Sequence, residues 1–192
     1  MPPPKDHFWE TLKREQVYDG SPFLKVELHT VKLPDGRIID DYHHITSGTY
    51  ANVIPVAPDG RFYVLNQYRY GADRIGYALP GGRIEEGEDP AGGAMRELKE
   101  EMGLVSESLE LLGKYNVSCS YGLSDNFYFL GLNTVPDQEA ALMESDDLEW
   151  SETLSLSQDE ARNAIRDNRF VSLSHVAGVS MAMLYLSDSS RT

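Results

Sequence analysis

Three glutamates near the middle of the chain, Glu97, Glu100 and Glu101, have the type and spacing to bind a metal ion. On a helix, side chains three and four residues apart are neighbours, so these carboxylates lie on nearly one face, where like charges repel. Carboxylate oxygens are the ligands that Mg²⁺ and Mn²⁺ prefer, usually a few of them together with substrate phosphates. The glutamates therefore predict either a divalent-metal site or a solvated acidic face, the usual fate of a charge run.

The spacing of the surrounding residues decides between these two interpretations. Gly82 and Glu88 are followed by Arg-Glu-Leu at 96–98, Glu-Glu at 100–101 and Gly-Leu at 103–104, so every fixed position of the Nudix box is filled. At average residue usage, this pattern would arise by chance on the order of 10⁻¹⁰ times per starting position. The sequence therefore resembles the Nudix hydrolases, which split a nucleoside diphosphate linked to another moiety by using divalent metals held on the helix of the box.

The resemblance implies a role for each polar residue of the box. The metal ligands are expected to be the Gly81 carbonyl, Glu97, Glu100 and Glu101, with Mg²⁺ or Mn²⁺ as the cofactor. Glu100, Glu101 and Arg96 are expected to be catalytic residues, with Arg96 orienting the carboxylates, and Glu88 is expected to support the preceding loop. Roughly two or three divalent ions would offset the charge on a pyrophosphate and lower the pKa of a bound water.

Outside the box, the similarity narrows to one branch of the family. The segment QYRYG at Gln67–Gly71 and a late acidic segment are similar to the ADP-ribose and nucleotide-sugar diphosphatases. In that branch the arginine of QYR, here Arg69, helps to bind substrate; the alternative is a surface residue at a strand end. Ser124 and Asp125 are also expected to bind substrate.

The same branch places an acidic residue in a late loop, where it acts as general base or completes the metal site. Here the segment MESDDLEW offers Glu144, Asp146 and Asp147. Alignment backwards from the following apolar strand favours Glu144 as the base and Asp146 as an additional metal ligand. For each of the three, a solvated acidic loop is the alternative.

Three positions depart from the pattern of the ADP-ribose enzymes. These usually carry glutamate where this chain has Ala78, often an arginine near Tyr42–His43, and a proline near the position of Tyr121. The expected reaction is therefore hydrolysis of ADP-ribose or another nucleoside diphosphate sugar to a nucleoside monophosphate and a sugar phosphate. The alternatives are a dinucleoside polyphosphate or nucleoside triphosphate hydrolase, and a module that binds a nucleotide sugar without cleaving it.

Two other reactive groups receive a structural interpretation. Cys119 cannot form an intramolecular disulfide, because it is the one cysteine of the chain, and we expect it to be a small buried side chain. His43 and His44 are not expected to share a metal ion, since adjacent residues on a strand point to opposite faces.

The elements that position the box follow from local signals. Asp89 suits a helix N-cap, Pro90 the first helical position, and Gly103 a left-handed C-terminal turn. Arg96 lies four residues before Glu100 and is expected to hold it through a charge-assisted pair. The glutamates therefore lie on a helix with a defined beginning and end.

Strands surround this helix, and two further helices follow them. The tetrapeptide PDGR occurs at Pro34–Arg37 and Pro58–Arg61 between β-branched runs, which predicts two hairpins. Residues 157–168 and 172–186 predict the late helices, the second a buried packing helix. We expect an α/β fold, a Nudix-type α/β/α sandwich with a mixed β-sheet in residues 48–192. Residues 1–47 form a small antiparallel β region, which in the resembling branch is exchanged between subunits of a homodimer.

The composition limits the partners. The 192-residue chain has a net charge of −14, so it lacks the basic stripe expected for nucleic acid and the basic face expected for a membrane surface. The first residues lack the apolar stretch of a signal peptide, and the single cysteine fits a reducing compartment. We therefore expect a cytoplasmic enzyme with a small nucleotide substrate.

Overall fold

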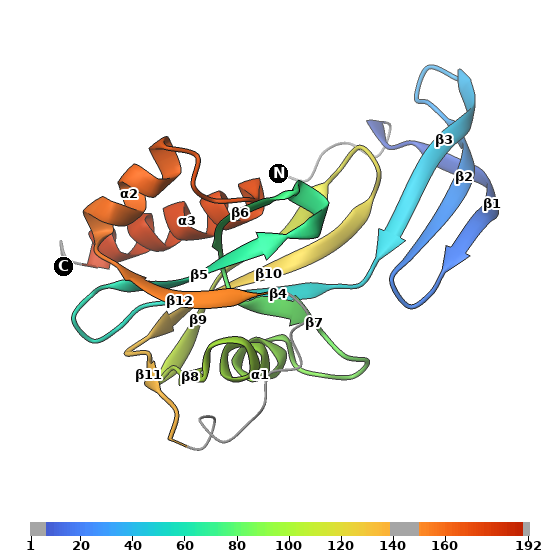
Figure 1. The fold of residues 1–192 in the computed structure, drawn as a ribbon. Coiled ribbons are helices and arrows are strands. Elements are labelled where there is room, and N and C mark those ends of the chain that lie inside the picture. The colour runs from blue at the N-terminus through green and yellow to red at the C-terminus, as the bar shows by residue number, and fades with distance from the viewer. Residues whose placement is uncertain (1–6, 139–149, 190–192) are drawn as a thin grey trace. The chain divides into compact units, whose positions relative to one another are not determined.

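The computed structural model describes residues 7–138 and 150–189, which form two compact units. One unit contains the chain up to Gly48 together with Asn116–Asp125. The other contains Thr49–Tyr115 and the chain from Asn126 onward. Figure 1 colours the chain from its N-terminus to its C-terminus, and each unit is described below by itself.

The first unit is built on a three-stranded antiparallel sheet in the order β1-β2-β3. Its strands are β1 (Glu10–Gly20), β2 (Leu24–Lys32) and β3 (Ile38–Ser47). The first PDGR segment forms the predicted hairpin turn between β2 and β3, where Gly36 adopts a φ of +88° and the Leu33 amide donates to the Arg37 carbonyl at 2.8 Å. The antiparallel N-terminal region is therefore confirmed.

The remaining part of the first unit, Asn116–Asp125, is the tip of a hairpin whose strands begin and end in the second unit. The Ile45 amide donates to the Tyr121 carbonyl at 2.7 Å, and the Tyr42 hydroxyl donates to the Ser120 carbonyl, also at 2.7 Å. The tip is thus hydrogen-bonded to β3, although more than 70 residues separate the two in the sequence.

The second unit contains two sheets and a short strand pair. The first sheet has the order β7-β4-β10-β9, in which β4 and β10 run parallel, and the second is antiparallel in the order β12-β5-β6. Strands β8 and β11 form the pair. The strands are β4 (Tyr50–Pro55), β5 (Phe62–Arg69), β6 (Arg74–Ala78), β7 (Gly81–Arg83), β8 (Leu104–Val105), β9 (Ser108–Ser118), β10 (Leu123–Leu132), β11 (Val135–Pro136) and β12 (Ser151–Leu156).

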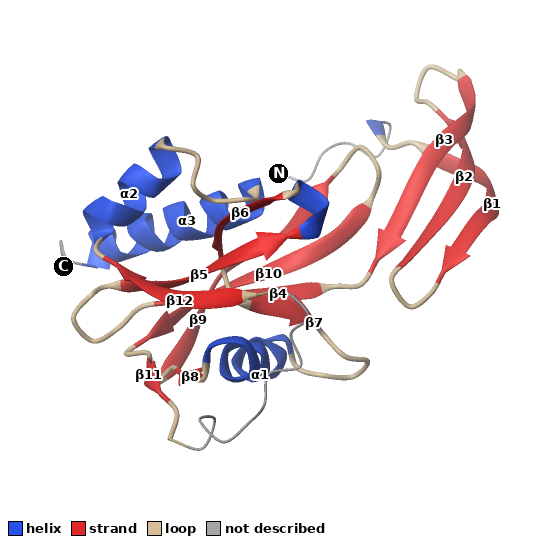
Figure 2. Ribbon diagram, viewed as in Figure 1, coloured by secondary structure: helices blue, strands red, loops and turns tan. Residues whose placement is uncertain are grey.

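Among the described residues, three α-helices accompany these sheets, all where the sequence predicts them (Figure 2). They are α1 (Pro90–Met102), α2 (Gln158–Arg166) and α3 (Leu173–Ser189), and a 3-10 turn, η2 (Tyr70–Ala72), follows β5. The Ser157 hydroxyl oxygen accepts a bond from the Glu160 amide and so caps α2, and the Glu160 carboxylate accepts one from the Ser157 amide. None of the helices in the two described ranges is long and apolar enough to cross a membrane.

The two faces of β4 pack into different cores. Ala51 and Val53 contact the core under α1, whereas Ile54 and Val56 contact the core under α2 and α3. Helix α1 therefore covers one face of the sheets and the two late helices cover the other (Figure 1). This arrangement confirms the predicted α/β/α sandwich with a mixed sheet.

The prediction of a second hairpin is wrong beyond its turn. The PDGR segment at Pro58–Arg61 does form a tight turn, in which the Ala57 amide donates to the Arg61 carbonyl at 2.8 Å. Beyond the turn, one isolated bridge joins Val56 to Phe62, and β4 and β5 then belong to different sheets. The turn itself was predicted correctly. Beyond it, β4 pairs with the distant strand β10 and β5 pairs with the distant strand β12, instead of with each other.

The predicted burial of Cys119 is also wrong. The thiol is exposed, because Cys119 lies in the turn between β9 and β10.

Helix α3 is buried on one face only, through Val179 and Ala182. Its other face exposes Leu184, since α3 forms the outer layer of the sandwich.

Candidate active site

Helix α1 begins and ends at the residues that the sequence predicts. The Asp89 carboxylate accepts bonds from the Ala91 and Gly92 amides, both at 3.1 Å, and Pro90 occupies the first turn. Gly103 closes the helix with a φ of +63°. Because local capping fixes both ends of α1, the positions of its glutamates along the helix axis are fixed as well.

Arg96 is the centre of the polar network on α1. Its Nε donates to Glu88 at 3.1 Å, and its Nη1 donates to Glu97 at 2.7 Å and to Glu100 at 2.9 Å. Its Nη2 donates to Glu88 and to the Arg83 carbonyl, both at 3.3 Å. The predicted Arg96–Glu100 pair is present, and one guanidinium joins three carboxylates.

Two glycines of the box leave space for these carboxylates. A Cβ at Gly82 would overlap the Glu97 carboxylate, and a Cβ at Gly93 would lie 2.9 Å from Glu88 Oε2. Such distances are shorter than real Cβ contacts, so a larger residue would displace the acidic side chain. The glycines thus set where the carboxylates lie, in addition to shaping the backbone.

Glu101 connects the helix to strand β7. Its Oε2 accepts a bond from the Gly81 amide at 2.8 Å, across 20 positions of sequence. Gly81 pairs with Asn52 of β4, and a Cβ there would overlap the β4 backbone at Ala51. Helix, loop and central strand are therefore in contact at one point, beside the glutamates.

The electrostatics of the site differ from one carboxylate to the next. Burial raises the pKa of Glu97, whose side chain is 15% exposed, although Arg96 opposes this shift. Hydrogen bonds from Arg96 and from the Glu85 amide lower the pKa of Glu88. The pKa of Arg96 is raised, chiefly by Glu88, so the guanidinium is always charged. Arg96 is thus a counter-cation within the carboxylate cluster.

The donor set of α1 fits a hard divalent cation. Arg96 Nη1 engages one oxygen of Glu97 and one oxygen of Glu100, so each carboxylate keeps its second oxygen for another contact. Glu101 and the backbone of Gly81 lie next to each other through their bond. Carboxylate and carbonyl oxygens are what Mg²⁺ and Mn²⁺ bind, so these residues fit the expected ion.

The structure brings the box residues together but does not join every predicted site residue to them. Arg69 lies at the end of β5, where the Gln67 side-chain oxygen accepts from its Nε at 2.6 Å. Ser124 and Asp125 belong to the first unit, and the Ser124 hydroxyl donates to the Ser47 carbonyl. Their substrate-binding roles stay predictions.

The predicted general base cannot be placed. Glu144 and its alternatives Asp146 and Asp147 lie in residues 139–149, outside the described residues. The described chain resumes at residue 150, immediately before β12, which pairs with β5. The role of Glu144 therefore stays a prediction.

His175 of α3 is a partly buried histidine that lies outside the motif. Its Nδ1 accepts a long bond of 3.4 Å from the Leu79 amide, which lies two residues before Gly81. Burial, and then the charge of Arg69, lower the pKa of His175 to about 4, so it is neutral at pH 7. The one feature of the sequence that could have drawn attention to His175 is its polarity within the apolar segment that forms α3.

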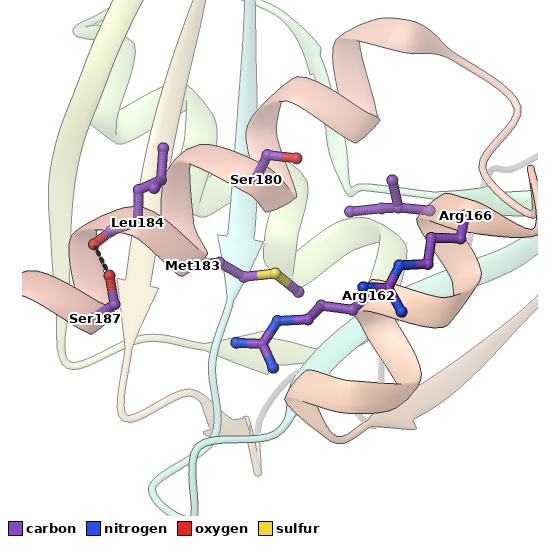
Figure 3. A pocket seen from close by; sticks show the side chains of 7 residues that line it. Arg162, Arg166, Ser180, Met183, Leu184 and Ser187 are labelled. Carbon is purple, nitrogen blue, oxygen red and sulfur yellow. Dashed lines mark hydrogen bonds between the residues drawn. The ribbon is translucent and has the colours of Figure 1, made fainter.

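A separate hollow of about 410 Å³ lies between α2 and α3 (Figure 3). Arg162 and Arg166 of α2 and Ser180 and Met183 of α3 line part of it. Arg162 is paired with Asp159 at 2.8 Å. Among the described residues that line this hollow, none belongs to the predicted site, so the surface of α1 is the candidate active site.

Comparison with protein families assigns both parts of the chain. Residues 47–173 match the NUDIX domain, and residues 9–45 match the nucleoside diphosphate sugar hydrolase N-terminal domain. The first match covers well over half of the chain. The chain belongs to the Nudix hydrolase family, and the NUDIX match includes all of α1 and its glutamates.

Individual relatives cover most of the chain at modest identity. A methanol dehydrogenase activator from Bacillus methanolicus is 27% identical over 91% of this chain and 92% of its own. A CMP-5'-(N-acetyl-N-hydroxy-3-aminopropyl)phosphonate hydrolase from Streptomyces rubellomurinus is 30% identical over 86% and 78%. An ADP-ribose pyrophosphatase from Mycobacterium tuberculosis is 29% identical over 73% and 69%.

A solved structure described as an ADP compounds hydrolase superposes with a TM-score of 0.81 over 96% of this chain and 97% of its own. Its sequence is 21% identical, so the likeness establishes the fold.

Proposed function

We propose that this Nudix hydrolase cleaves the pyrophosphate bond of ADP-ribose or another nucleoside diphosphate sugar, with Mg²⁺ or Mn²⁺ as cofactor. The products are a nucleoside monophosphate and a sugar phosphate. The observation that carries the proposal is the network in which Arg96 joins three carboxylates of the box while Glu101 bonds the Gly81 backbone. The N-terminal family match and the relatives named for ADP-ribose or CMP-linked substrates support the substrate class.

The residues of α1 have distinct roles in this proposal. Glu97, Glu100 and Glu101 hold the ions, the Gly81 carbonyl contributes a further ligand, and Arg96 fixes the carboxylates before an ion arrives. When bound, the ions offset the charge of the pyrophosphate and lower the pKa of a coordinated water. Glu144 takes the proton of the attacking water in this scheme.

Substrate recognition is assigned to residues outside the box. Arg69 binds an anionic group of the substrate, with its guanidinium oriented by Gln67. Ser124 and Asp125 contact the sugar or the base. Ala78 is fully buried on β6, and alanine offers no acidic group where the ADP-ribose enzymes usually carry glutamate, so the choice of sugar is left to other contacts.

The test is a turnover panel with ADP-ribose, UDP-glucose, GDP-mannose, a CMP-linked phosphonate, a dinucleoside polyphosphate and a nucleoside triphosphate. Each is incubated with Mg²⁺ and with chelator, using wild type, Glu101→Gln and the control Glu86→Gln. Glu86 is an exposed glutamate of the preceding loop. We expect nucleoside monophosphate from a sugar diphosphate, lost with chelator and reduced by about 100-fold or more in Glu101→Gln, as when one electrostatic contact to a transition state is removed.

The panel also separates the alternatives. Preference for the polyphosphate or the triphosphate would overturn the substrate class while retaining the pyrophosphohydrolase. Binding of a sugar diphosphate without turnover in the presence of Mg²⁺ would identify a binding module. Equal activity of Glu101→Gln and Glu86→Gln would contradict the proposed metal site.

We further propose that the N-terminal sheet forms part of a homodimer. Strand β1 is an edge strand whose residues are exposed except at Gly20, and it displays Leu12, Val17 and Tyr18 to solvent. Exposed apolar groups on an unpaired edge favour association with another chain. Light scattering at micromolar concentration should give the mass of two chains, and the mass of one chain would contradict the proposal.

A further inference from the structure

A second cluster of potential metal ligands lies on the N-terminal sheet, in the unit that does not contain α1. Glu27 and His29 lie on β2 and His44 lies on β3, and one donor atom from each lies within 4.8 Å of those of the other two. Glu27 is directly opposite His44 in the strand register. His29 is two residues farther along β2, so all three side chains point to the same face.

This face of the sheet is covered. His29 is 6% exposed, and its ring lies 4.7 Å from the His44 ring at an interplanar angle of 10°. Gly122, in the hairpin tip of the same unit, lies so close to the His44 imidazole that no Cβ would fit there. The hairpin tip thus lies against His44 on this face, where His29 is buried and the side chains of Glu27 and His44 stay partly exposed.

Hydrogen bonding leaves one ligand atom of the cluster unused. Glu27 Oε2 lies 3.2 Å from His29 Nε2 and 4.0 Å from His44 Nδ1. His44 Nδ1 is buried and has no hydrogen-bond partner. A buried polar atom without a partner is costly, and coordination of an ion would remove that cost.

One cation lies near the cluster, where coordination requires the lone pair of each imidazole nitrogen. Arg14, opposite His29 on the exposed strand β1, is the cation that opposes an incoming ion, and its long side chain is exposed to solvent.

We propose that Glu27, His29 and His44 bind one divalent transition-metal ion, with Zn²⁺ as the preferred class, which joins β2 to β3. Two imidazoles and one carboxylate suit Zn²⁺ rather than Mg²⁺. Two ligand atoms that each lie about 2.0–2.1 Å from a tetrahedral ion are about 3.4 Å apart. This separation is close to the 3.2 Å between Glu27 Oε2 and His29 Nε2. His44, whose side chain is 30% exposed, turns its ring to close the site, and water takes the fourth position.

Such an ion would stabilise the N-terminal unit. An ion that binds only the folded form raises the free energy of unfolding. The site is independent of the proposed pyrophosphohydrolase activity, because its three ligands belong to the N-terminal unit.

The test uses the full chain in excess Mg²⁺, which occupies hard oxygen sites, and measures Zn²⁺ binding by competition with a chromophoric chelator. Wild type and the control His43→Gln, altered at the exposed neighbour of His44, are expected to bind one Zn²⁺ per chain. His44→Gln and Glu27→Gln are expected to bind it more than about 100-fold more weakly, since even changes to outer-shell partners cost about 10–100-fold.

Co²⁺ provides a readout on the wild type that does not depend on the folding of any variant. We expect the intense visible absorption of a four-coordinate ion with nitrogen ligands. The weak spectrum of a six-coordinate oxygen site, or no Zn²⁺ binding in excess Mg²⁺, would overturn the proposal. So would a Zn²⁺ site that persists in His44→Gln and disappears in Glu100→Gln, because that ion would lie on α1.

Discussion

The two candidate ion sites of this chain balance their charges in opposite ways. On α1, three carboxylates surround one guanidinium, so Arg96 reduces the repulsion before any metal binds. On the N-terminal sheet, two imidazoles and one carboxylate include no such internal cation, and His44 Nδ1 is left without a bond. The first site thus has a cation of its own chain among its carboxylates, whereas the second has a buried nitrogen without a hydrogen-bond partner.

This difference indicates which kind of ion binding, exchangeable or structural, each site favours. An ion at α1 would bind the carboxylate oxygens that Arg96 does not engage, which favours exchange of hard cations together with a phosphate substrate. An ion at the N-terminal cluster would replace the Glu27–His29 hydrogen bond and give the buried His44 Nδ1 a partner, which favours permanent, structural binding. The following four predictions test this contrast, from the largest expected effect to the smallest.

Replacing Gly82 with alanine should reduce turnover by about 100-fold, because the new Cβ would displace the Glu97 carboxylate, and an error of about 1 Å can cost that much. The control is Gly92→Ala on α1, where a Cβ meets only Asp89 at 3.9 Å. Turnover measured with Mg²⁺ should be unchanged in the control. Equal rates for both variants would show that the position of Glu97 does not limit the reaction.

Replacing Arg96 with glutamine should lower the free energy of unfolding by about 2 kcal/mol without metal, because charged hydrogen bonds to three carboxylates are lost. Mg²⁺ should restore part of this loss by supplying another cation. Urea denaturation with and without Mg²⁺ measures both effects. Arg162→Gln, which removes one exposed helical pair, should cost under about 0.5 kcal/mol.

Hydrogen exchange should separate the two ions by region. Zn²⁺ should slow amide exchange in β2 and β3 by about tenfold, equal to about 1.4 kcal/mol, while Mg²⁺ should slow exchange around α1 instead. His44→Gln should lose the first effect and keep the second. Protection of β2 and β3 by Mg²⁺ in place of Zn²⁺ would contradict the division between the sites.

The pH dependence of stability should reveal the burial of Glu97. Because burial raises its pKa, the folded state binds this proton more tightly than the unfolded state does. Its unfavourable contribution therefore develops as the pH rises from about 4.3, the usual glutamate pKa, through the raised value. Without metal, Glu97→Gln should be more stable than wild type at pH 7 by less than about 1 kcal/mol, and the gain should vanish at pH 4.

Glu88 provides the contrast for that measurement. Its pKa is lowered by Arg96, so it contributes stability above the usual glutamate pKa, and this contribution is lost as the pH falls through the lowered value. Glu88→Gln should therefore be less stable than wild type at pH 7. Urea denaturation at both pH values compares the two variants, and shifts of the same sign would refute the assignment.

Features with local causes were predictable from the sequence. Helix α1 is the clearest case, because Asp89, Pro90 and Gly103 fix its ends without help from distant residues. Its glutamates were singled out by their spacing and by the family resemblance that this spacing carries, and their role as metal ligands stays a prediction. The sequence could not explain why positions 82 and 93 are glycine, because the explanation depends on where Glu97 and Glu88 lie in space.

Features with distant causes were not predictable. Strand β1 was missed because its mainly polar segment is exposed along its length and shows no apolar period. The cluster on β2 and β3 was missed because of a register shift after His29. Counting from the turn without that shift would pair Glu27 with His43, and a one-residue slip exchanges the faces of a strand.

A cytoplasmic location remains a prediction from composition.

The hairpin tip at Asn116–Asp125 has a consequence for dividing this protein into parts. It is inserted between strands of the catalytic domain in sequence, yet it is hydrogen-bonded to the N-terminal sheet through Ile45 and Tyr42 and packs against His44. A protein cut after Gly48 would leave the Tyr121 and Ser120 carbonyls without these donors. A chimaera that borrows the N-terminal sheet from a relative must therefore exchange two segments at once, and homologous recombination at a single crossover would join mismatched halves.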